Sequence, residues 1–208
     1  MKIIEPKVEI ISAIDGEKML KQIELAARNC YKSEDKITED CESAKKIITM
    51  LMSKHHDAML EFADIIVRLT CDIGVYKDLT RHRHCSFAIE STRYCNYSKD
   101  KFGNEITFIK PCNIDNNDLY VCWEQSMRNI EYYYNVMSKL GAKPDQLRML
   151  LPHSTAASVV MKANIREWRH ILKLRTSPAA HPSVQQIMKM VLAEFKKNIP
   201  VLFDDIGE

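Results

Sequence analysis

A basic stretch at positions 81–94, with the sequence RHRHCSFAIESTRY, limits most strongly how this chain can fold. Three arginines and two histidines lie within 13 residues, and Glu90 is the only carboxylate among them. Such a cluster repels itself unless anions compensate it, so the fold must leave it in water or set it against an anion. Arginine suits bidentate recognition of phosphate or carboxylate. The stretch therefore predicts a site for a phosphorylated ligand, and a solvated basic turn explains its composition equally well.

Charge is balanced over the whole chain, which has 30 Lys and Arg residues against 28 Asp and Glu residues. A protein that coats nucleic acid needs a basic excess, so we expect local anion binding and no nucleic-acid polymer as a partner. The 208 residues suffice for one hydrophobic core, and we expect residues 1–208 to form a single domain. No apolar run reaches the ~18 residues of a membrane span, no signal-peptide segment opens the chain, and the seven cysteines are scattered. We therefore expect a cytoplasmic protein with reduced thiols and no membrane partner.

Glycine-rich nucleotide motifs are absent from the sequence. Neither G-x-G-x-x-G nor G-x-x-x-x-G-K occurs, and the chain has five glycines in all. The sequence therefore argues against a Rossmann dinucleotide site and against a P-loop.

Hydrophobic periodicity predicts an α+β fold in which a central, mostly antiparallel sheet is flanked by helices. Alternating or apolar runs predict strands at 8–14, 63–71, 105–110 and 154–162. Helical spacing predicts helices at 16–31, 39–54, 75–83, 115–140, 144–151, 164–175 and 183–198. Thr38 is the expected N-cap of the second helix, and Gly141 is the expected C-cap of the longest one. Between 85 and 103 the periodicity is weak, with a loop expected at 96–99.

Polar residues converge on the helix predicted at 164–175. Arg166 and His170 are i, i+4 neighbours, so their side chains face the same way. Arg148 stands in an apolar segment, where an arginine needs a partner if it is buried. An internal salt bridge to Glu61 or Asp78 would meet that need, and so would a ligand anion.

The basic stretch and its distant partners resemble the flavin-dependent thymidylate synthase family. Arg81-His82-Arg83, followed after seven residues by Ser91, is similar to the R-H-R-x7-S signature of that family. Further matches run in family order from position 53 to about 190, roughly two thirds of the chain. They are His56, Glu61, Ser86, Arg93, Tyr94, Arg148 with Leu151-Pro152, Asn164, Arg166, His170, Leu174-Arg175, and Thr176-Ser177 with Ala180-His181-Pro182.

The resemblance implies an enzyme of the methyltransferase class that reductively methylates dUMP to dTMP, a step of nucleotide biosynthesis. Methylenetetrahydrofolate would give the carbon and NADPH the hydride, and FAD would relay the electrons, so the protein would be a flavoprotein. The family is typically a homotetramer with active sites at subunit interfaces, and its members need no cysteine nucleophile.

The resemblance also implies roles for individual residues. Arg175 would be catalytic, because a guanidinium can stabilise negative charge on the uracil ring although it cannot act as a base at neutral pH. FAD would be contacted by Arg81, His82, Arg83, Ile89, Asn164, Ile165, Arg166 and His170. The dUMP contacts would come from Asp78, Leu79, Thr80, Arg81, Glu90, Ser91, Thr92, Arg93, Arg148 and Arg175. Arg93 and Arg148 would hold its phosphate, and no metal is expected.

Five positions depart from the family pattern. Ile89 stands where relatives often have Gln or Glu, and Ala58 stands where a hydroxyl often contacts FAD. Ala88, Asp78 and Phe62 replace a frequent Asn, a longer Gln or Glu, and a common His. These changes imply altered flavin contacts, and they leave open a relative that binds FAD and dUMP without catalysis.

Two other classes of protein fit single features of the chain. Cys112 follows a proline, as the nucleophile of flavin-free thymidylate synthases does, but no supporting motif surrounds it. A zinc or RNA-binding module could use His82, His84, Cys85 and Cys95. Their spacing matches no common structural zinc site.

Overall fold

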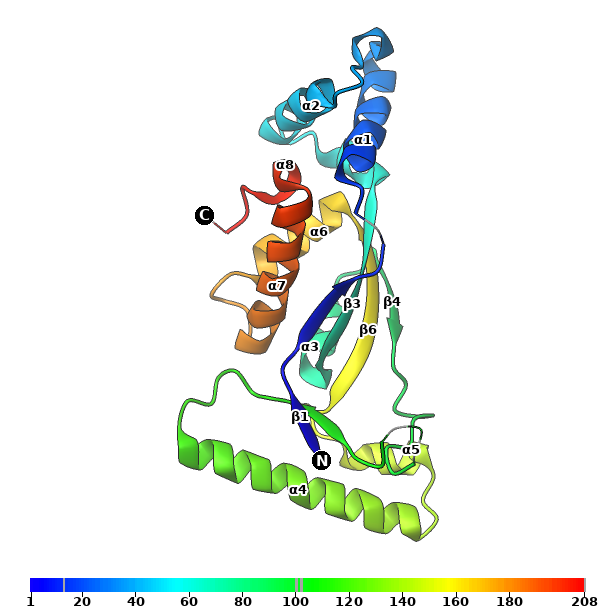
Figure 1. Ribbon diagram of the computed structural model, residues 1–208, viewed down its shortest axis with the longest axis vertical. Coiled ribbons are helices and arrows are strands. Elements are labelled where there is room, and N and C mark those ends of the chain that lie inside the picture. Colours follow the sequence, from blue (N-terminus) through cyan, green and yellow to red (C-terminus); the bar gives the residue numbers. More distant parts are fainter. Residues whose placement is uncertain (13, 100, 102, 208) are drawn as a thin grey trace. The chain divides into compact units, whose positions relative to one another are not determined.

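The structure, a computed structural model, describes residues 1–12, 14–99, 101 and 103–207. It combines helices with two β-sheets (Figure 1). In chain order the elements are β1 (Lys2–Ile4), β2 (Lys7–Ile10), α1 (Gly16–Tyr31), η1 (Glu34–Lys36), α2 (Glu42–Ser53), η2 (Asp57–Phe62), β3 (Asp64–Asp72), α3 (Ile73–Leu79), β4 (Cys85–Ile89), β5 (Thr107–Ile109), α4 (Asn117–Lys139), α5 (Pro144–Leu147), η4 (Arg148–Leu150), β6 (Ala156–Asn164), α6 (Ile165–Arg175), α7 (Pro182–Asn198) and α8 (Pro200–Phe203).

Backbone contacts divide the chain into two compact units. Unit 1 comprises Met1–Lys7, Leu69–Arg81 and Ala88–Val160. Unit 2 comprises Val8–Arg68, His82–Phe87 and Met161–Glu208. The strands β3, β4 and β6 each contribute residues to both units. The single domain expected for residues 1–208 stays a prediction.

Four strands form a sheet in the order β2-β3-β6-β4, and β1 and β5 form a separate parallel pair. The strands β3 and β6 run antiparallel, because Ile73 N donates to Thr155 O at 3.2 Å and Ile165 N donates to Ala63 O at 2.9 Å. Every second side chain along β3 is buried, namely Ile65, Val67, Leu69 and Cys71. The predicted combination of an antiparallel sheet with helices is confirmed.

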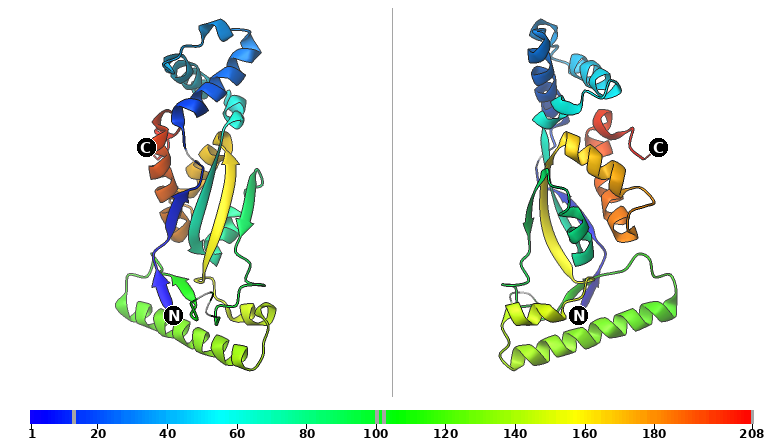
Figure 2. Two further views of the ribbon diagram at one scale, coloured as in Figure 1. Left: turned by 45° about the vertical axis from the view of Figure 1, so that its right-hand side comes forward. Right: turned by 180° about the vertical axis from the view of Figure 1, so that it is seen from behind.

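Unit 1 contains the longest helix, α4, which runs beside β1 and β5 (Figures 1 and 2). Met127 and Tyr134 of this helix belong to the same buried cluster as Phe108 of β5. Asn116 caps the first turn by accepting a hydrogen bond from Asp118 N at 2.8 Å. Gly141, with φ +90°, follows the last turn, where the sequence predicts a glycine cap.

Unit 2 contains the pair α1–α2 and the helices α6, α7 and α8. Glu24 of α1 is fully buried; its carboxylate lies 2.7 Å from Arg28 Nε and accepts a hydrogen bond from Ser43 Oγ of α2 at 3.0 Å. Trp168 and Phe195, from α6 and α7, meet edge to face with ring centroids 5.2 Å apart. These contacts fix α1 to α2 and α6 to α7.

The N-terminus of α2 differs from the prediction. The helix begins at Glu42 with Cys41 as its N-cap, rather than at Thr38. Cys41 has φ +62°, which keeps it outside the helix, and the Thr38 hydroxyl is hydrogen-bonded to Asp40 at 2.5 Å. Local side-chain bonds of this kind compete with helix formation.

The elements around the basic stretch also differ from the prediction. The helix α3 begins at Ile73, because the Asp72 carboxylate accepts from Val75 N at 2.7 Å, and it ends at Leu79, before the stretch begins. The strand β4 lies where the periodicity is weak. Its alternating exposed residues are the small Ser86 and Ala88, which give little contrast in hydrophobicity.

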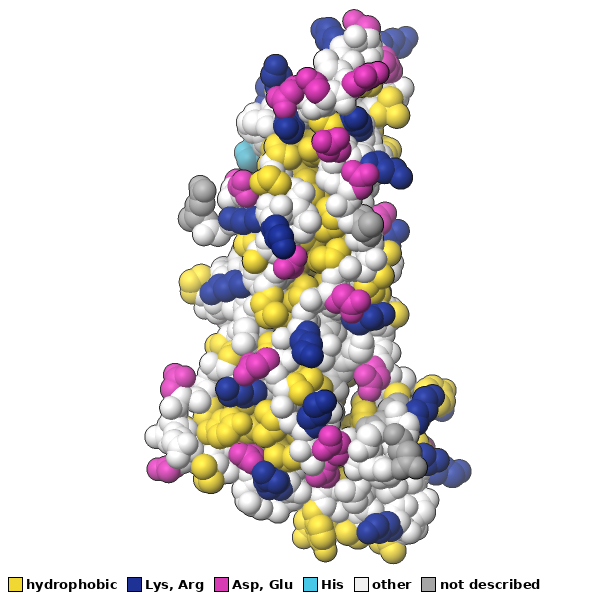
Figure 3. Space-filling view, in the orientation of Figure 1, with side chains coloured by type: hydrophobic (Ala, Val, Ile, Leu, Met, Phe, Trp, Pro, Cys, Tyr) yellow, Lys and Arg dark blue, Asp and Glu magenta, His cyan; other side chains and the backbone are white. Residues whose placement is uncertain are grey.

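The strand expected at 8–14 is shorter, since β2 ends at Ile10. Position 13 of the expected strand, and positions 100 and 102 of the weakly periodic segment, lie outside the described residues. On the face seen in Figure 3, Lys and Arg side chains alternate with Asp and Glu, in line with the balanced charge. Within the described part of the chain, no helix has both the length and the apolar character needed to cross a membrane.

Candidate active site

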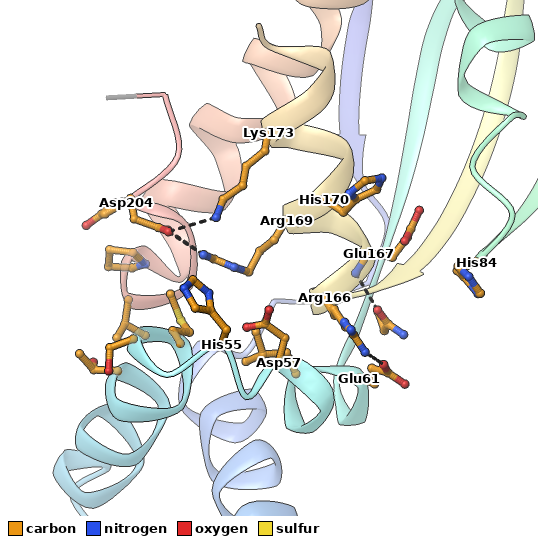
Figure 4. Close-up of a pocket in the computed structure, with 18 residues that line it drawn as sticks. His55, Asp57, Glu61, His84, Arg166, Glu167, Arg169, His170, Lys173 and Asp204 are labelled. Atoms are coloured by element: carbon orange, nitrogen blue, oxygen red, sulfur yellow. Dashed lines mark hydrogen bonds and ion pairs between the residues drawn. The ribbon is translucent and has the colours of Figure 1, made fainter.

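A cavity of about 990 Å³ opens within unit 2 (Figure 4). Its walls are the end of α2, the turn η2, the junction of β6 with α6, and the C-terminal segment 200–205. This volume is at the upper end of the range for pockets that hold small molecules and cofactors. Ten of its lining residues have acidic, basic or imidazole side chains and are labelled in the close-up: His55, Asp57, Glu61, His84, Arg166, Glu167, Arg169, His170, Lys173 and Asp204.

The helix α6 supplies the basic wall of the cavity. Asn164 ends β6 and caps α6, since its side chain accepts from Glu167 N at 2.8 Å. Ile165 and Trp168 on this helix are fully buried, and Trp168 Nε1 donates to Ile65 O at 3.0 Å. Helical spacing then turns the residues at 166, 169, 170 and 173 toward the cavity.

Two carboxylates balance the charge of this wall. Glu61 of η2 lies 2.6 Å from Arg166, and both side chains are about half exposed. The Asp205 carboxylate takes two hydrogen bonds from Arg169, at 2.6 and 2.7 Å, and lies 3.6 Å from Lys173. The hydrogen bonds from Arg169 lower the pKa of Asp205 from its usual value, so this carboxylate stays ionised on acidification.

A second, smaller hollow of about 430 Å³ adjoins the first and shares Glu61, His84 and Asn164 with it. The basic stretch lines this hollow with Arg83 and Ser86. Of the residues expected at the flavin, Asn164, Arg166 and His170 line the larger hollow, and Arg83 and Asn164 line the smaller one. His84, whose sequence context favours a surface or packing residue, lines both hollows.

His82 lies behind the cavity wall and is 7% exposed. Its Nε2 accepts a hydrogen bond from Arg175 Nε at 3.0 Å, and its Nδ1 lies 3.5 Å from the Glu167 carboxylate. Burial, together with the electrostatic effect of the neighbouring Arg175 and His170, lowers the pKa of His82 to about 4. The lowered pKa means that the nearby Glu167 carboxylate does not keep the ring protonated, so the ring is neutral at pH 7. Because Nε2 accepts the hydrogen bond from Arg175, the single ring proton is assigned to Nδ1. A neutral His82 fixes the Arg175 guanidinium through Nε.

We expect acid to destabilise the fold through His82. The folded protein keeps this ring neutral down to a pH of about 4, while the unfolded chain protonates it near 6.5. Stability is therefore fully present above pH 6.5 and is lost as the pH falls toward 4. Between pH 7 and pH 4.5 the wild-type protein should lose about 2 kcal/mol of unfolding free energy through His82. The measurement compares this loss in wild type with the loss in His82→Gln, which lacks the imidazole. The exposed residue His56 gives the control, since His56→Gln should keep the wild-type pH slope; equal slopes for wild type and His82→Gln would contradict the assignment.

The residues expected at dUMP lie mostly in unit 1. Arg81 is exposed, with its Nε 4.0 Å from the Asp78 carboxylate. Arg93 is exposed and lies over the ring of Tyr94 at 5.6 Å, and Arg148 is exposed at the start of η4. Because Arg148 is exposed, water can solvate its guanidinium, and of its two expected salt-bridge partners Glu61 pairs with Arg166 while Asp78 lies 4.0 Å from Arg81.

Two of the expected contacts have fully buried side chains. Leu79 and Ile165 are each 0% exposed and belong to the hydrophobic core. A ligand can meet these residues only through the backbone. Of the remaining expected residues, Thr80 and Ser91 are exposed, Ile89, Glu90 and Thr92 are partly buried, and Arg175 is partly buried at the last position of α6.

The structure also bears on the two other classes of protein, the cysteine-dependent thymidylate synthase and the zinc module. Cys112 is exposed in the turn after β5. Among the residues that the structure describes, no group of three or more His, Cys, Asp or Glu side chains is arranged to hold a metal ion.

Sequence reasoning missed the C-terminal wall of the cavity. Arg169 and Lys173 follow Arg166 at helical spacing, which is a signal that could have extended the basic face of α6. Asp205 is 36 residues from its partner Arg169, and no local pattern predicts a pair at that distance.

Comparisons with known proteins identify the family of the chain. The sequence model of the family described as "Thymidylate synthase complementing protein" matches residues 10–201. The flavin-dependent thymidylate synthase of Corynebacterium glutamicum is 26% identical over 95% of this chain and 83% of its own length. The probable flavin-dependent thymidylate synthase of Mycobacterium phage L5 is 24% identical over 89% of this chain and 79% of its own length.

Two solved structures share the fold. Thymidylate synthase X from Helicobacter pylori, crystallised with FAD and dUMP, superposes with a TM-score of 0.78 at 19% identity, over 96% of this chain and 98% of its own. The UMP/dUMP methylase PolB from Streptomyces cacaoi, bound with 5-Br dUMP, superposes with a TM-score of 0.79 at 21% identity, over 98% of this chain and 96% of its own. The chain therefore belongs to the thymidylate synthase complementing protein family, the family of the flavin-dependent thymidylate synthases.

Proposed function

We propose that this protein methylates dUMP reductively to dTMP, with methylenetetrahydrofolate as the carbon donor, NADPH as the reductant and FAD as the cofactor. The observation that carries the proposal is the placing of Asn164, Arg166 and His170 on one cavity, with Arg83 on a smaller hollow that shares Asn164 with it. These are residues that the R-H-R-x7-S signature and its distant partners associate with flavin. The names of the relatives, and the FAD and dUMP in the Helicobacter pylori structure, point the same way.

The donors in the cavity fit FAD. Arg166 donates from Nη1 to Glu61. A guanidinium has five N–H donors, so Arg166 can also hold a diphosphate. Arg83 and His170 add polar groups from the basic stretch and from α6. When bound, FAD supplies the hydride-carrying chemistry of the reaction. Arg81, His82, Ile89 and Ile165 are the remaining positions associated with the cofactor, and the burial of His82 and Ile165 limits them to positioning or backbone roles.

The dUMP site is assigned to the exposed groups of unit 1. Arg93 and Arg148 would hold the phosphate, because each presents a planar guanidinium to solvent. Ser91 and Thr92 add hydroxyl donors. The remaining positions are Asp78, Leu79, Thr80, Arg81 and Glu90, of which Leu79 can contribute only backbone atoms.

Arg175 would act on the uracil ring. Negative charge develops on the pyrimidine as its C5 attacks the one-carbon unit, and a fixed guanidinium stabilises that charge. Its bond to neutral His82 holds the guanidinium in place before the reaction begins. No cysteine nucleophile is needed in this scheme, and the exposed Cys112 takes no part in it.

We further propose a cytoplasmic homotetramer in which residues 1–208 act as one domain and the active sites lie at subunit interfaces. Large apolar side chains on and next to α4 are exposed in the single chain: Leu119 at 61%, Tyr132 at 63% and Leu140 at 82%. Patches of this kind commonly bury themselves against another copy.

The test is conversion of dUMP by the purified protein. With FAD, NADPH and methylenetetrahydrofolate present, we expect dTMP to form, and omission of any one of them should abolish its formation. Cys112→Ser should keep the wild-type rate. Binding of FAD and dUMP without any dTMP would instead identify a relative that has lost catalysis, and loss of turnover in Cys112→Ser with flavin still bound would restore the cysteine mechanism.

A further inference from the structure

The segment 90–97 contains Ser91 and Arg93, which are proposed to contact dUMP, and a hydrogen bond from one tyrosine joins its two ends. The strand β4 ends at Ile89, and the chain then turns, with Tyr94 N and Cys95 N both donating to Ser91 O, at 3.1 and 3.0 Å. Tyr97 follows this turn and is 8% exposed. Its hydroxyl donates to Glu90 Oε1 at 2.7 Å, so the two ends of the segment 90–97 are joined.

Both ends of this segment are anchored to rigid elements of unit 1. Glu90 N donates to Ser158 O at 2.9 Å, and the second oxygen of its carboxylate accepts from Ser158 N at 3.3 Å, which fixes Glu90 to β6. Tyr97 N donates to the Tyr134 hydroxyl of α4 at 3.2 Å, and the two rings lie 6.2 Å apart. Ser91, Thr92 and Arg93 lie between these anchors.

Each oxygen of the Glu90 carboxylate therefore accepts a hydrogen bond from the protein. Two of its hydrogen bonds go to Tyr97 and Ser158, and a bond from a hydroxyl to a carboxylate is stronger than one between neutral groups. A substrate phosphate beside Glu90 would also be repelled by its charge. Glu90 thus acts on the segment that it holds, and the exposed side chains of Ser91 and Arg93 are left to meet the nucleotide.

We propose that Tyr97 is a positioning residue for dUMP, which holds Ser91 and Arg93 in place by clamping Glu90 to the start of the loop. This inference rests on the proposed function, since it takes Ser91 and Arg93 as dUMP contacts. The clamp belongs to unit 1 alone, so it should affect the nucleotide and leave the flavin cavity of unit 2 unchanged.

The test uses the FAD-loaded protein and Tyr97→Phe, which removes the hydroxyl and keeps the ring. We expect the dissociation constant for dUMP and the KM for dUMP to rise about tenfold, because a lost bond to a charged group frees the loop. The kcat at saturating dUMP and the dissociation constant for FAD should stay within about twofold of wild type. Tyr31→Phe is the matched control, since Tyr31 is 59% exposed at the end of α1, is assigned to neither ligand and should leave all four constants unchanged.

Two results would overturn the clamp. One is an unchanged dUMP dissociation constant in Tyr97→Phe, and the other is an equal loss of FAD and dUMP binding, which would mark Tyr97 as a general structural residue. A double variant with Glu90→Gln separates these cases further, because a clamp predicts that Tyr97→Phe adds little once Glu90 is changed. If wild type itself does not bind dUMP, the proposed function fails, whereas normal binding in both wild type and Tyr97→Phe refutes the clamp alone.

Discussion

Arg175→Ala should lower kcat for dTMP formation by about 10²–10³-fold, with little change in FAD affinity. The guanidinium is the group assigned to the developing charge on uracil, and removal of a preorganised donor from a transition state costs rate rather than ground-state binding. Its position at the end of α6, with Nε on His82, makes it rigid before the substrate arrives. Steady-state kinetics and a flavin titration of the same preparation measure the two effects.

Arg68→Ala is the matched control for Arg175→Ala. Arg68 is a partly exposed arginine of β3 that pairs with Glu9 at 3.0 Å, lines neither hollow and is assigned to neither ligand. It should keep wild-type kcat. An Arg175→Ala variant that turned over at the wild-type rate would remove Arg175 from the mechanism.

Asp205→Ala should lower the free energy of unfolding by about 2 kcal/mol and weaken FAD binding. Arg169 is 8% exposed, and its guanidinium is held by the two oxygens of Asp205 and by the carbonyl of Leu202. Removal of the carboxylate leaves a buried arginine without its counter-charge. The C-terminal segment, which is a wall of the cavity, would then lose its fixed position on α6.

Asp204→Ala is the matched control for Asp205→Ala. Asp204 is exposed and makes no bond to Arg169 among the described residues, so Asp204→Ala should change the unfolding free energy by less than about 0.5 kcal/mol. Because the folded-state pKa of Asp205 is lowered, the stabilisation exists above the ordinary aspartate pKa and is lost as the pH falls through the folded value. Equal unfolding free energies of the two variants at pH 7 would contradict the role of Asp205.

Local signals in the sequence were enough to predict most of the helices. The helix α1 has the predicted bounds, Gly16–Tyr31, because Asp15 caps it at Lys18 N and apolar residues recur along one face. The helix α6 starts where β6 ends, and Asn164 is both the last strand residue and the N-cap. In both helices the N-cap residue and the apolar spacing lie within one short stretch of sequence, so both can be predicted from it.

Other features depend on contacts that no short window contains. The strand β4 pairs through its backbone, as the bond from Glu90 N to Ser158 O shows just beyond its end, and its own side chains carry little pattern. Glu90 and Ser158 are 68 residues apart in the sequence, so the hydrogen bond between the Glu90 carboxylate and Ser158 N could not be predicted from a local pattern. The resemblance placed residues at the flavin and at dUMP, while the physical state of each residue, such as the neutral and buried His82, required the fold.

The proposed function requires that reducing equivalents held on the flavin of this protein are used to methylate dUMP. The most direct measurement is anaerobic: protein loaded with FAD is reduced with one equivalent of NADPH and then mixed with dUMP and methylenetetrahydrofolate. We expect the flavin absorbance of the oxidised form to return while dTMP appears in equal amount, and we expect neither change when dUMP is omitted. Flavin that stays reduced in the presence of both substrates, with no dTMP formed, would contradict the account.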